Sequence, residues 1–200
     1  MKMTQPKIMV VDDEPIIRMD LREMLENEGY LVVAEAKNGE EAVEQAHRHK
    51  PDLIIMDVKM PVLNGIKASS IIRSFSDSSI LLLTAYSQKE LVQDARKAGV
   101  TAYLVKPVSE DDLIPAVEIA LSQKEKVVSL KKDINDLKQK IEDRKAVEKA
   151  KGKLMSALSL EEDAAYKWMQ QVSMQRRVPL VKLAEEILSG EQAIFTQDQY

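Results

Sequence analysis

The sequence predicts an α/β domain over its first 121 residues, followed by an entirely helical part. Apolar runs typical of buried strands alternate five times with amphipathic helical patterns, which indicates a parallel sheet covered on both faces. Residues 122 to about 157 contain no Pro and one Gly, as in a long helix. The charge also changes between the two parts. Residues 1–121 hold 14 Lys and Arg against 20 Asp and Glu, a net −6, and residues 122–200 hold 15 against 13, a net +2.

The elements of the front part follow one another at short spacing, with Gly29, Gly65 and Gly99 at joints between them. The last helix is predicted to begin after Ser109, with acidic residues in its first turn, and Pro115 is a candidate kink. The predicted strands are KIMVVD (7–12), LVVAEA (31–36), DLIIMD (52–57), SILLLT (79–84) and TAYLVK (101–106), and the predicted helices are 14–28, 39–49, 64–74, 88–98 and 110–121.

A short heptad pattern follows the front domain. Its apolar positions are spaced 3, 4, 3 and 4 residues apart, as in a coiled-coil seam, and the seam ends where Arg144 and Glu148 take the next two positions. Two to three heptads are too few for a stable isolated coiled coil, so we expect a dimer neck over residues 123–143, supported at both ends. The seam consists of Val127, Leu130, Ile134, Leu137 and Ile141.

The rear part, residues 144–190, is predicted to be a three-helix module. Ser159 and Glu162 form a candidate capping box before the second helix, Pro179 is expected in the first turn of the third, and Gly190 ends it. Residues 191–200 are expected to form a loose tail. The residues expected to face the core are Val147, Ala150, Leu154, Met155, Ala165, Trp168, Met169, Val172, Met174, Leu180, Leu183, Ala184, Ile187 and Leu188.

Composition excludes several kinds of site. There is no Cys, which excludes disulfides and thiolate chemistry, and the only two His, His47 and His49, lie together in a polar stretch. No apolar run approaches the roughly 18 residues that a membrane span needs, and the N-terminus lacks a hydrophobic signal core. We therefore expect a cytoplasmic protein without a membrane partner.

Polar residues lie at the C-terminal ends of four predicted strands: Asp12 and Asp13, then Asp57, Thr84 and Lys106. Ligands of open parallel sheets bind at this edge. Three convergent carboxylates favour a hard divalent cation such as Mg²⁺, and a nearby Lys and Thr could hold phosphoryl oxygens. Any one of these Asp residues could simply cap a helix, but that explanation does not serve for all five positions together.

The segments VVDDEP, IIMDVKMPVLNG, LLLTAY and YLVKP resemble, in order, the motifs of the response-regulator receiver domain of two-component systems, over residues 5–122. The resemblance implies a flavodoxin-like fold with five strands in the order 2-1-3-4-5. Haloacid-dehalogenase-type phosphotransferases also use an Asp nucleophile, but Lys59 stands where their second Asp would be.

The receiver resemblance also implies roles for single residues. Asp57 would accept a phosphoryl group from a sensor histidine kinase, so the chain would be a phosphorylated regulator rather than an enzyme. Mg²⁺ would be held by Asp12, Asp13, Asp57 and the Lys59 backbone carbonyl. Thr84 and Lys106 would bind the phosphoryl group, Tyr103 would move inward with Thr84, and the Lys106–Pro107 peptide would be cis.

Cationic side chains gather in the rear part. Residues 144–182 hold nine Lys and Arg against four Asp and Glu. A Lys-rich helix face is often merely solvated. Here the cations begin where the apolar seam ends and the acids cluster at one helix start, a pattern that favours contact with a phosphate backbone. The candidate contacts are Arg144, Lys145, Lys149, Lys151, Lys153, Arg176 and Arg177.

The segment RKAVEKAKGKLM, followed by EEDAAYKWMQQVSMQRRVPLVKLAEEIL, resembles the ANTAR domain, an RNA-binding three-helix module found after receiver domains. Gln170 stands where this family often has Arg, and Ser173 where Ala is common. The matching positions are Ala150, Lys151, Gly152, Leu154, Met155, Ala165, Tyr166, Met174, Ala184 and Ile187.

The ANTAR resemblance implies transcription antitermination by a dimer that captures paired RNA hairpins in mRNA leaders, as in ethanolamine-utilisation regulators. We expect phosphorylation of Asp57 to promote the dimer through the neck and the face formed by the fourth helix, fifth strand and fifth helix of the receiver. Tyr166 is the better aromatic candidate for a base contact, since Trp168 falls on the apolar face. Phe195 and Tyr200 are the other aromatics of this part. A DNA-binding or protein-binding output is the alternative, but the helix over 179–189 has only Lys182 as a cation, which makes DNA unlikely.

Overall fold

The structure, a computed structural model, describes residues 5–85 and 98–190. The chain divides into two units, Met1–Ser129 and Leu130–Tyr200, and each is described by itself. Within the described ranges, no helix is both long enough and apolar enough to cross a membrane. The predicted helix over 88–98 lies almost entirely outside the described residues, as do the predicted tail and its aromatic residues.

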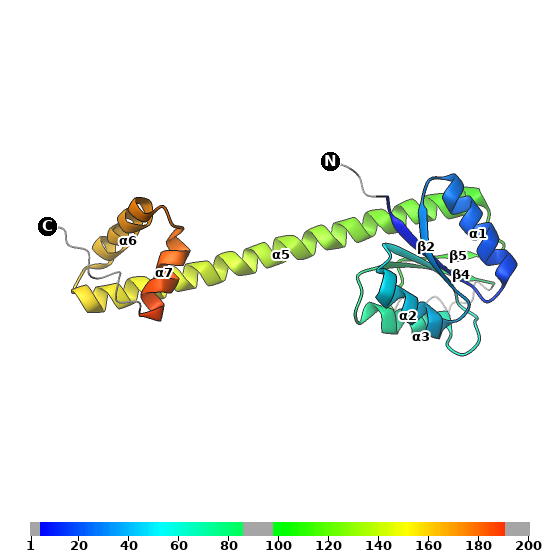
Figure 1. The fold of residues 1–200 in the computed structure, drawn as a ribbon, viewed down its shortest axis with the longest axis horizontal. Helices are drawn as coiled ribbons and strands as arrows, with labels where there is room; N and C mark the ends of the chain where they lie inside the picture. Colours follow the sequence, from blue (N-terminus) through cyan, green and yellow to red (C-terminus); the bar gives the residue numbers. More distant parts are fainter. Residues whose placement is uncertain (1–4, 86–97, 191–200) are drawn as a thin grey trace. The chain divides into compact units, whose positions relative to one another are not determined.

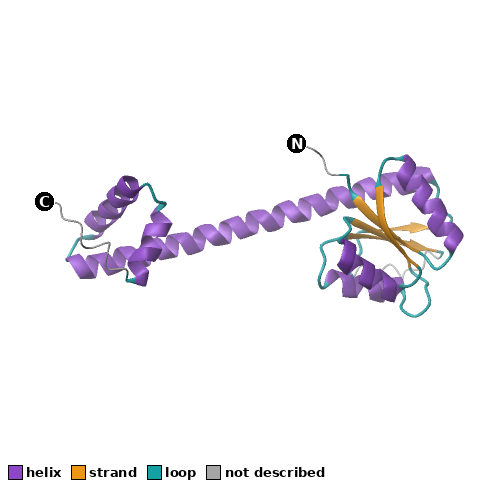
Figure 2. Cartoon of the chain, in the orientation of Figure 1, coloured by secondary structure: helices purple, strands orange, loops and turns teal. Residues whose placement is uncertain are grey.

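The first unit is a five-stranded parallel sheet with the strand order β2-β1-β3-β4-β5, which confirms the predicted α/β fold (Figures 1 and 2). The ends of the strands agree with the sequence prediction to within one residue. The elements are β1 (Lys7–Val11), α1 (Pro15–Asn27), β2 (Leu31–Ala36), α2 (Gly39–His49), β3 (Leu53–Asp57), α3 (Gly65–Arg73), β4 (Ser79–Thr84), β5 (Ala102–Val105) and the first turns of α5 (Glu110–Leu158).

Side chains alternate between the two faces of the sheet along each strand, so the core of this unit consists of two layers. On β1, Met9 and Val11 pack with α2 and α3, while Ile8 and Val10 pack with α1 and the beginning of α5. The central strands β3 and β4 are buried along their whole length. Because both faces are covered, these strands are continuous apolar runs, and the sheet is a rigid support for the residues at its C-terminal edge.

In the second unit, the C-terminal turns of α5 pack with α6 (Glu162–Arg176) and α7 (Leu180–Ser189). The predicted core is largely confirmed: Ala150, Leu154, Ala165, Met169 and Ile187 are fully buried. Pro115 lies inside α5, which continues past it, and α5 carries the seam residues in one uninterrupted helix. All five seam residues are exposed in the single chain.

Two details of the predicted module are wrong at its helix ends. Ser159 does not cap α6: its φ of 52° places it in the left-handed region after α5, and Glu161 is the N-cap residue, without a side-chain hydrogen bond. Pro179 is the N-cap of α7 rather than a first-turn residue. The left-handed turn at Ser159 ends α5 and changes the direction of the chain, so the capping pattern starts two residues too early.

Two predicted core residues lie on the surface instead. Met174 is 78% exposed and Leu188 is 37% exposed. Met174 stands five residues after Met169, which turns it to the far side of α6. The prediction that Met174 belongs to the core used only its apolar character and is therefore wrong.

Candidate functional site

The C-terminal edge of the receiver sheet brings together the five predicted residues. Asp12 and Asp13 directly follow β1, Asp57 and Thr84 end β3 and β4, and Lys106 follows β5. Asp12, Asp57 and Thr84 are buried, whereas Asp13 is exposed. The parallel strands are the reason for this convergence, since they all end at one edge.

Lys106 connects the two buried carboxylates. Its Nζ lies 2.6 Å from Asp12 Oδ2 and 2.7 Å from Asp57 Oδ1. The Lys106 backbone N–H donates to the Thr84 carbonyl at 2.8 Å, which holds the strand end in register. The Lys106–Pro107 peptide is cis, as predicted. One ammonium thus compensates two buried carboxylates, and a net negative charge remains at this edge.

Burial changes the acidity of the site. Burial raises the pKa of Asp57 above its ordinary value, and the nearby Asp12 charge adds to this effect, although hydrogen bonds from Lys106 and from the Lys59 backbone oppose it. Burial also acts to lower the pKa of Lys106, but its hydrogen bonds to Asp12 and Asp57 outweigh this and leave the pKa raised. Lys106 therefore stays protonated beside the candidate phosphoacceptor.

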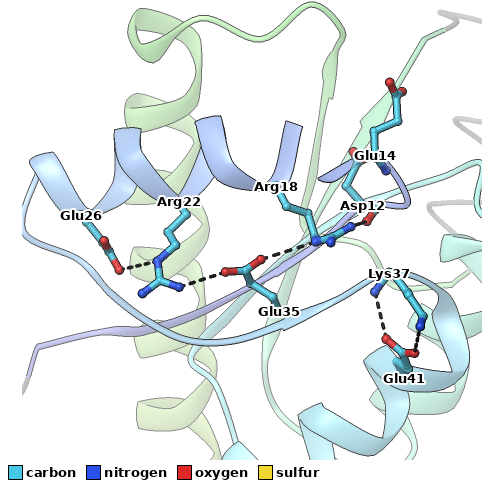
Figure 3. A network of polar contacts seen from close by, with 8 residues as sticks. All are labelled: Asp12, Glu14, Arg18, Arg22, Glu26, Glu35, Lys37 and Glu41. Carbon is cyan, nitrogen blue, oxygen red and sulfur yellow. Dashed lines mark hydrogen bonds and ion pairs between the residues drawn. The ribbon is translucent and has the colours of Figure 1, made fainter. Parts of the chain in front are cut away.

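Arg18, on α1, supports Asp12 and was missed by the sequence analysis. Its Nη1 donates to the Asp12 backbone carbonyl at 2.6 Å, and its Nε lies 3.4 Å from Glu35 Oε2 on β2 (Figure 3). Glu35 also contacts Arg22 at 3.0 Å, and the Glu14 backbone N–H donates to Asp12 Oδ1 at 3.0 Å. In the sequence, Arg18 is only a cation one turn after the start of the first helix. That position does not indicate that it contacts Asp12.

The loop after β3 passes close to Asp57. The Gly65 N–H donates to the Val58 carbonyl at 3.0 Å, and a Cβ on Gly65 would lie 2.1 Å from the Asp57 carbonyl oxygen. Asn64 caps α3 by accepting from the Lys67 N–H at 2.9 Å. Beside this loop lies an open hollow of about 470 Å³, lined by Val58, Lys59, Met60, Asn64 and Ile66.

The site fits a divalent cation in donor chemistry and in charge. Asp12, Asp13 and Asp57 carry three negative charges, and Lys106 compensates one, which leaves the charge that a divalent cation would balance. Among residues 5–85 and 98–190, however, no three carboxylate or imidazole groups already converge as ligands. Asp13 is exposed, and the Lys106 Nζ lies between the carboxylates of Asp12 and Asp57.

Tyr103, the predicted switch residue, lies on β5 and is 46% exposed. Thr84 is 7% exposed and lies one strand away, paired through Val105. The Tyr103 ring therefore lies outward in this structure. The predicted inward movement would take the receiver to a different conformation.

In the helical module, four of the predicted cationic contacts are engaged within the protein. Lys151 is only 9% exposed, and its Nζ lies 2.6 Å from both Glu148 Oε2 and Glu162 Oε1. Lys153 donates to the carbonyls of Ile187 and Leu188 at the end of α7. Lys145 pairs with Glu142, and Arg176 pairs with Glu186, both within 2.8 Å. Lys151 is therefore buried between two carboxylates, whereas Lys153 is exposed although it is hydrogen-bonded, and contact of either with phosphates stays a prediction.

Arg144, Lys149, Arg177 and Tyr166 lie on the surface of the module. Arg177 ends α6 with a φ of 52°, and its backbone N–H donates to the Met174 carbonyl at 3.2 Å. Tyr166 is 39% exposed, whereas Trp168 is half-buried against the core, as predicted. Lys145, Lys153 and Arg176 are exposed too, so among the predicted contacts Lys151 alone is buried.

Comparison with known proteins assigns both units. Residues 8–118 match the response regulator receiver domain, and residues 135–188 match the ANTAR domain. The transcriptional regulatory protein PdtaR of Mycobacterium tuberculosis is 49% identical over 182 residues, which cover 91% of this chain and 89% of that protein. The chemotaxis protein CheY of Bacillus subtilis is 38% identical over 117 residues, 58% of this chain and 98% of CheY.

Solved structures match the first unit. A CheY-like receiver domain protein from Methanospirillum hungatei superposes with a TM-score of 0.58 and 27% identity, covering 62% of this chain and 98% of that one. A LuxR-family two-component response regulator from Aurantimonas superposes with a TM-score of 0.57 and 34% identity, covering 60% and 87%. With the receiver match, the ANTAR match and the identity to PdtaR along most of its length, the chain belongs to the response regulators that carry an N-terminal receiver domain and a C-terminal ANTAR domain.

Proposed function

We propose that this response regulator is phosphorylated on Asp57 by a sensor histidine kinase and then acts through its ANTAR domain as an RNA-binding transcription antiterminator. The observation that carries the first half is the bridge from Lys106 to Asp12 and Asp57 at the sheet edge. The second half rests on the ANTAR match over residues 135–188.

Phosphoryl transfer would use the groups already at the edge. An Asp57 carboxylate oxygen attacks the phosphorus of a phosphohistidine, the P–N bond breaks, and the released imidazole takes a proton from solvent. Lys106 neutralises the phosphoryl oxygens, and the Thr84 hydroxyl donates to one of them. Receiver domains generally bind Mg²⁺ at this site. Here Asp12, Asp13, Asp57 and the Lys59 backbone carbonyl would hold the ion, which supplies further positive charge when bound.

Because a product acyl phosphate adds charge beside Lys106, it competes with Asp12 for the ammonium group. Lys106 and Thr84 would then move toward the phosphoryl group. This movement would favour an inward position of Tyr103 and change the surface formed by β5 and α5. The fourth helix, which we expect to take part in this switch, is predicted over residues 88–98 and lies almost entirely outside the described residues. The receiver itself is a regulator: its only chemistry would be its own phosphorylation and slow dephosphorylation.

Dimerisation through the neck would join two ANTAR modules on two hairpins. The exposed seam from Val127 to Ile141 supports this, since five apolar side chains at heptad spacing are left uncovered on α5. Paired modules would gain affinity for an RNA with two hairpins through effective concentration.

The test measures the oligomeric state and RNA affinity of the full chain, with and without beryllofluoride as a phosphoryl mimic. We expect beryllofluoride with Mg²⁺ to increase both dimer content and affinity for mRNA leader hairpins, and Asp57→Ala to abolish the increase. Unchanged affinity and oligomeric state would refute the coupling. Preference for duplex DNA over hairpin RNA would instead support a DNA-binding output.

A further inference from the structure

Asp12 is held at each of its polar groups. Its backbone N–H donates to the Ala36 carbonyl at 3.1 Å, and its Oδ1 accepts from the Glu14 N–H at 3.0 Å. Its Oδ2 lies 2.6 Å from the Lys106 Nζ, and its carbonyl oxygen accepts from Arg18 Nη1, also at 2.6 Å. Ala36 and Glu14 act through their backbone, so Lys106 and Arg18 are the two of these partners that act through a side chain.

The two side chains hold different parts of Asp12. Lys106 contacts a carboxylate oxygen, which is the group that a divalent cation needs as its ligand. Arg18 contacts the backbone carbonyl and leaves both carboxylate oxygens to other partners. A cation can therefore compete with Lys106 for the carboxylate while Arg18 keeps the backbone of Asp12 where it is.

Arg18 is itself fixed from two sides. Its side chain is 17% exposed, and its Nε is buried, 3.4 Å from Glu35 Oε2 on β2 (Figure 3). Its backbone N–H donates to the Glu14 carbonyl at 3.1 Å in the first turn of α1. The guanidinium thus connects β2 with the residue that follows β1, and its rigid planar form gives its hydrogen bond to Asp12 a defined direction.

We propose that Arg18 is a positioning residue for the divalent cation, because it fixes the backbone of Asp12 and so the direction of the Asp12 carboxylate. This rests on the proposed function, in which Asp12 is one of the Mg²⁺ ligands. A ligand that is already in place loses little freedom when the cation binds, so the groups that orient it contribute to metal affinity without touching the metal. Without Arg18, the Asp12 carbonyl loses this partner and the carboxylate is free to follow Lys106.

Arg22, one turn later on α1, has a structural role in nearly the same place. Its contacts among the described residues are with the carboxylates of Glu26 and Glu35, at 2.8 and 3.0 Å, and its side chain is 48% exposed. Arg18 shares Glu35 with it but directs its hydrogen bond to Asp12. Arg22 therefore provides a control with the same charge, the same helix and one partner in common.

The experiment titrates Mg²⁺ into the full chain by isothermal titration calorimetry, without a phosphoryl donor. We expect Arg18→Met to weaken Mg²⁺ binding about tenfold and Arg22→Met to bind like the wild type. Arg18→Lys keeps the charge and should bind with an intermediate affinity, because an ammonium group lacks the planar fork that reaches Asp12 and Glu35 together. Urea unfolding in EDTA shows whether each variant is folded. If Arg18→Met does not fold, Arg18→Gln takes its place with the same expected loss.

The charge of Arg18 makes the opposite prediction, since a cation beside the site repels Mg²⁺. Tighter Mg²⁺ binding by Arg18→Met would show that this repulsion outweighs positioning and would overturn the inference. Equal affinities of Arg18→Met and Arg22→Met would also overturn it, while the proposed function would stand. A wild type that binds no Mg²⁺ would overturn both the inference and the metal site of the proposed function.

Discussion

The two units of this protein each contain a lysine that bridges two carboxylates. In the receiver, Lys106 lies 2.6 and 2.7 Å from Asp12 and Asp57, and in the module, Lys151 lies 2.6 Å from both Glu148 and Glu162. The ammonium groups are similarly covered, with side-chain exposures of 17% and 11%. The carboxylates are not: Asp12 and Asp57 are 0% and 7% exposed, against 54% and 67% for the two Glu.

This difference separates a reactive site from a structural contact. Two carboxylates in a buried edge depend on the lysine, because neither can be solvated if the lysine moves. That dependence makes the receiver site responsive to any new charge, such as a phosphoryl group or a divalent cation. Glu148 and Glu162 remain hydrated with or without Lys151, so that bridge fixes the junction of α5 with α6 and little else. The same geometry thus has different consequences because burial differs.

The largest effect on stability is expected from a substitution that removes the lysine bridge of the receiver. Lys106→Met should lower the free energy of unfolding of the receiver by roughly 3 kcal/mol in EDTA, because two buried carboxylates lose the cation that bridges them. Mg²⁺ should restore part of the loss by supplying positive charge. Urea unfolding in EDTA and in Mg²⁺ measures both. Lys151→Met is the control: its loss should be clearly smaller and independent of Mg²⁺, and equal losses would contradict the comparison.

A second effect tests how tightly the receiver site is packed. Gly65→Ala should destabilise the receiver by about 2–3 kcal/mol, because the new Cβ would lie 2.1 Å from the Asp57 carbonyl oxygen, which is held in the sheet. Phosphorylation by acetyl phosphate should slow as Asp57 is displaced. Chemical unfolding and phosphorylation rates provide the measurement, and a variant as stable as the wild type would show that the loop can move away.

Gly152 provides the opposite case in the module. It lies inside α5, and apart from the adjacent backbone of that helix no atom lies within 4 Å of the position that a Cβ would take. Gly152 therefore fills no tight space, and it only adds the entropic cost of a flexible residue in a helix. Gly152→Ala should therefore stabilise the module by about 0.5–1 kcal/mol. Thermal unfolding of the full chain, followed by the fluorescence of Trp168 in the module, detects this. A destabilised variant would indicate a contact at Gly152 that the single chain does not contain.

The smallest effect concerns two carboxylates at opposite ends of β3. Burial acts to raise the pKa of Asp52, but the Lys124 ion pair and the Lys7 N–H, 2.8 Å away, outweigh it and leave this pKa below its ordinary value. Burial raises the pKa of Asp57 above its ordinary value. Carbon-13 NMR titration of the side-chain carboxyls should find this order.

The two shifts have opposite signs in stability. Asp52 stabilises the fold above its unfolded pKa, and this contribution disappears as pH falls through the lowered folded value. The Asp57 contribution is present below the unfolded pKa and is lost as pH rises through the raised one. Asp52→Asn should therefore cost stability at neutral pH and almost none at strongly acidic pH. A constant cost at every pH would refute the assignment to charge.

The sequence by itself determined the receiver fold and the members of its site. Continuous apolar runs identify strands buried on both faces, and parallel strands must end at one edge, so Asp12, Asp57, Thr84 and Lys106 converge whatever the details of packing. The module core was also readable, because helical periodicity distinguishes Ala150, Leu154 and Ala165 from their polar neighbours.

Only the tertiary structure decided which cations are engaged within the protein. Lys151 meets Glu162 from the next helix, Lys153 meets carbonyl groups 34 and 35 residues away, and Arg18 meets the backbone of Asp12 across a loop. Periodicity describes one helix at a time and carries no information about partners on another. Met174 differs, because its spacing from Met169 within α6 already turns it away from the core, and its apolar character alone led to the prediction that it is buried.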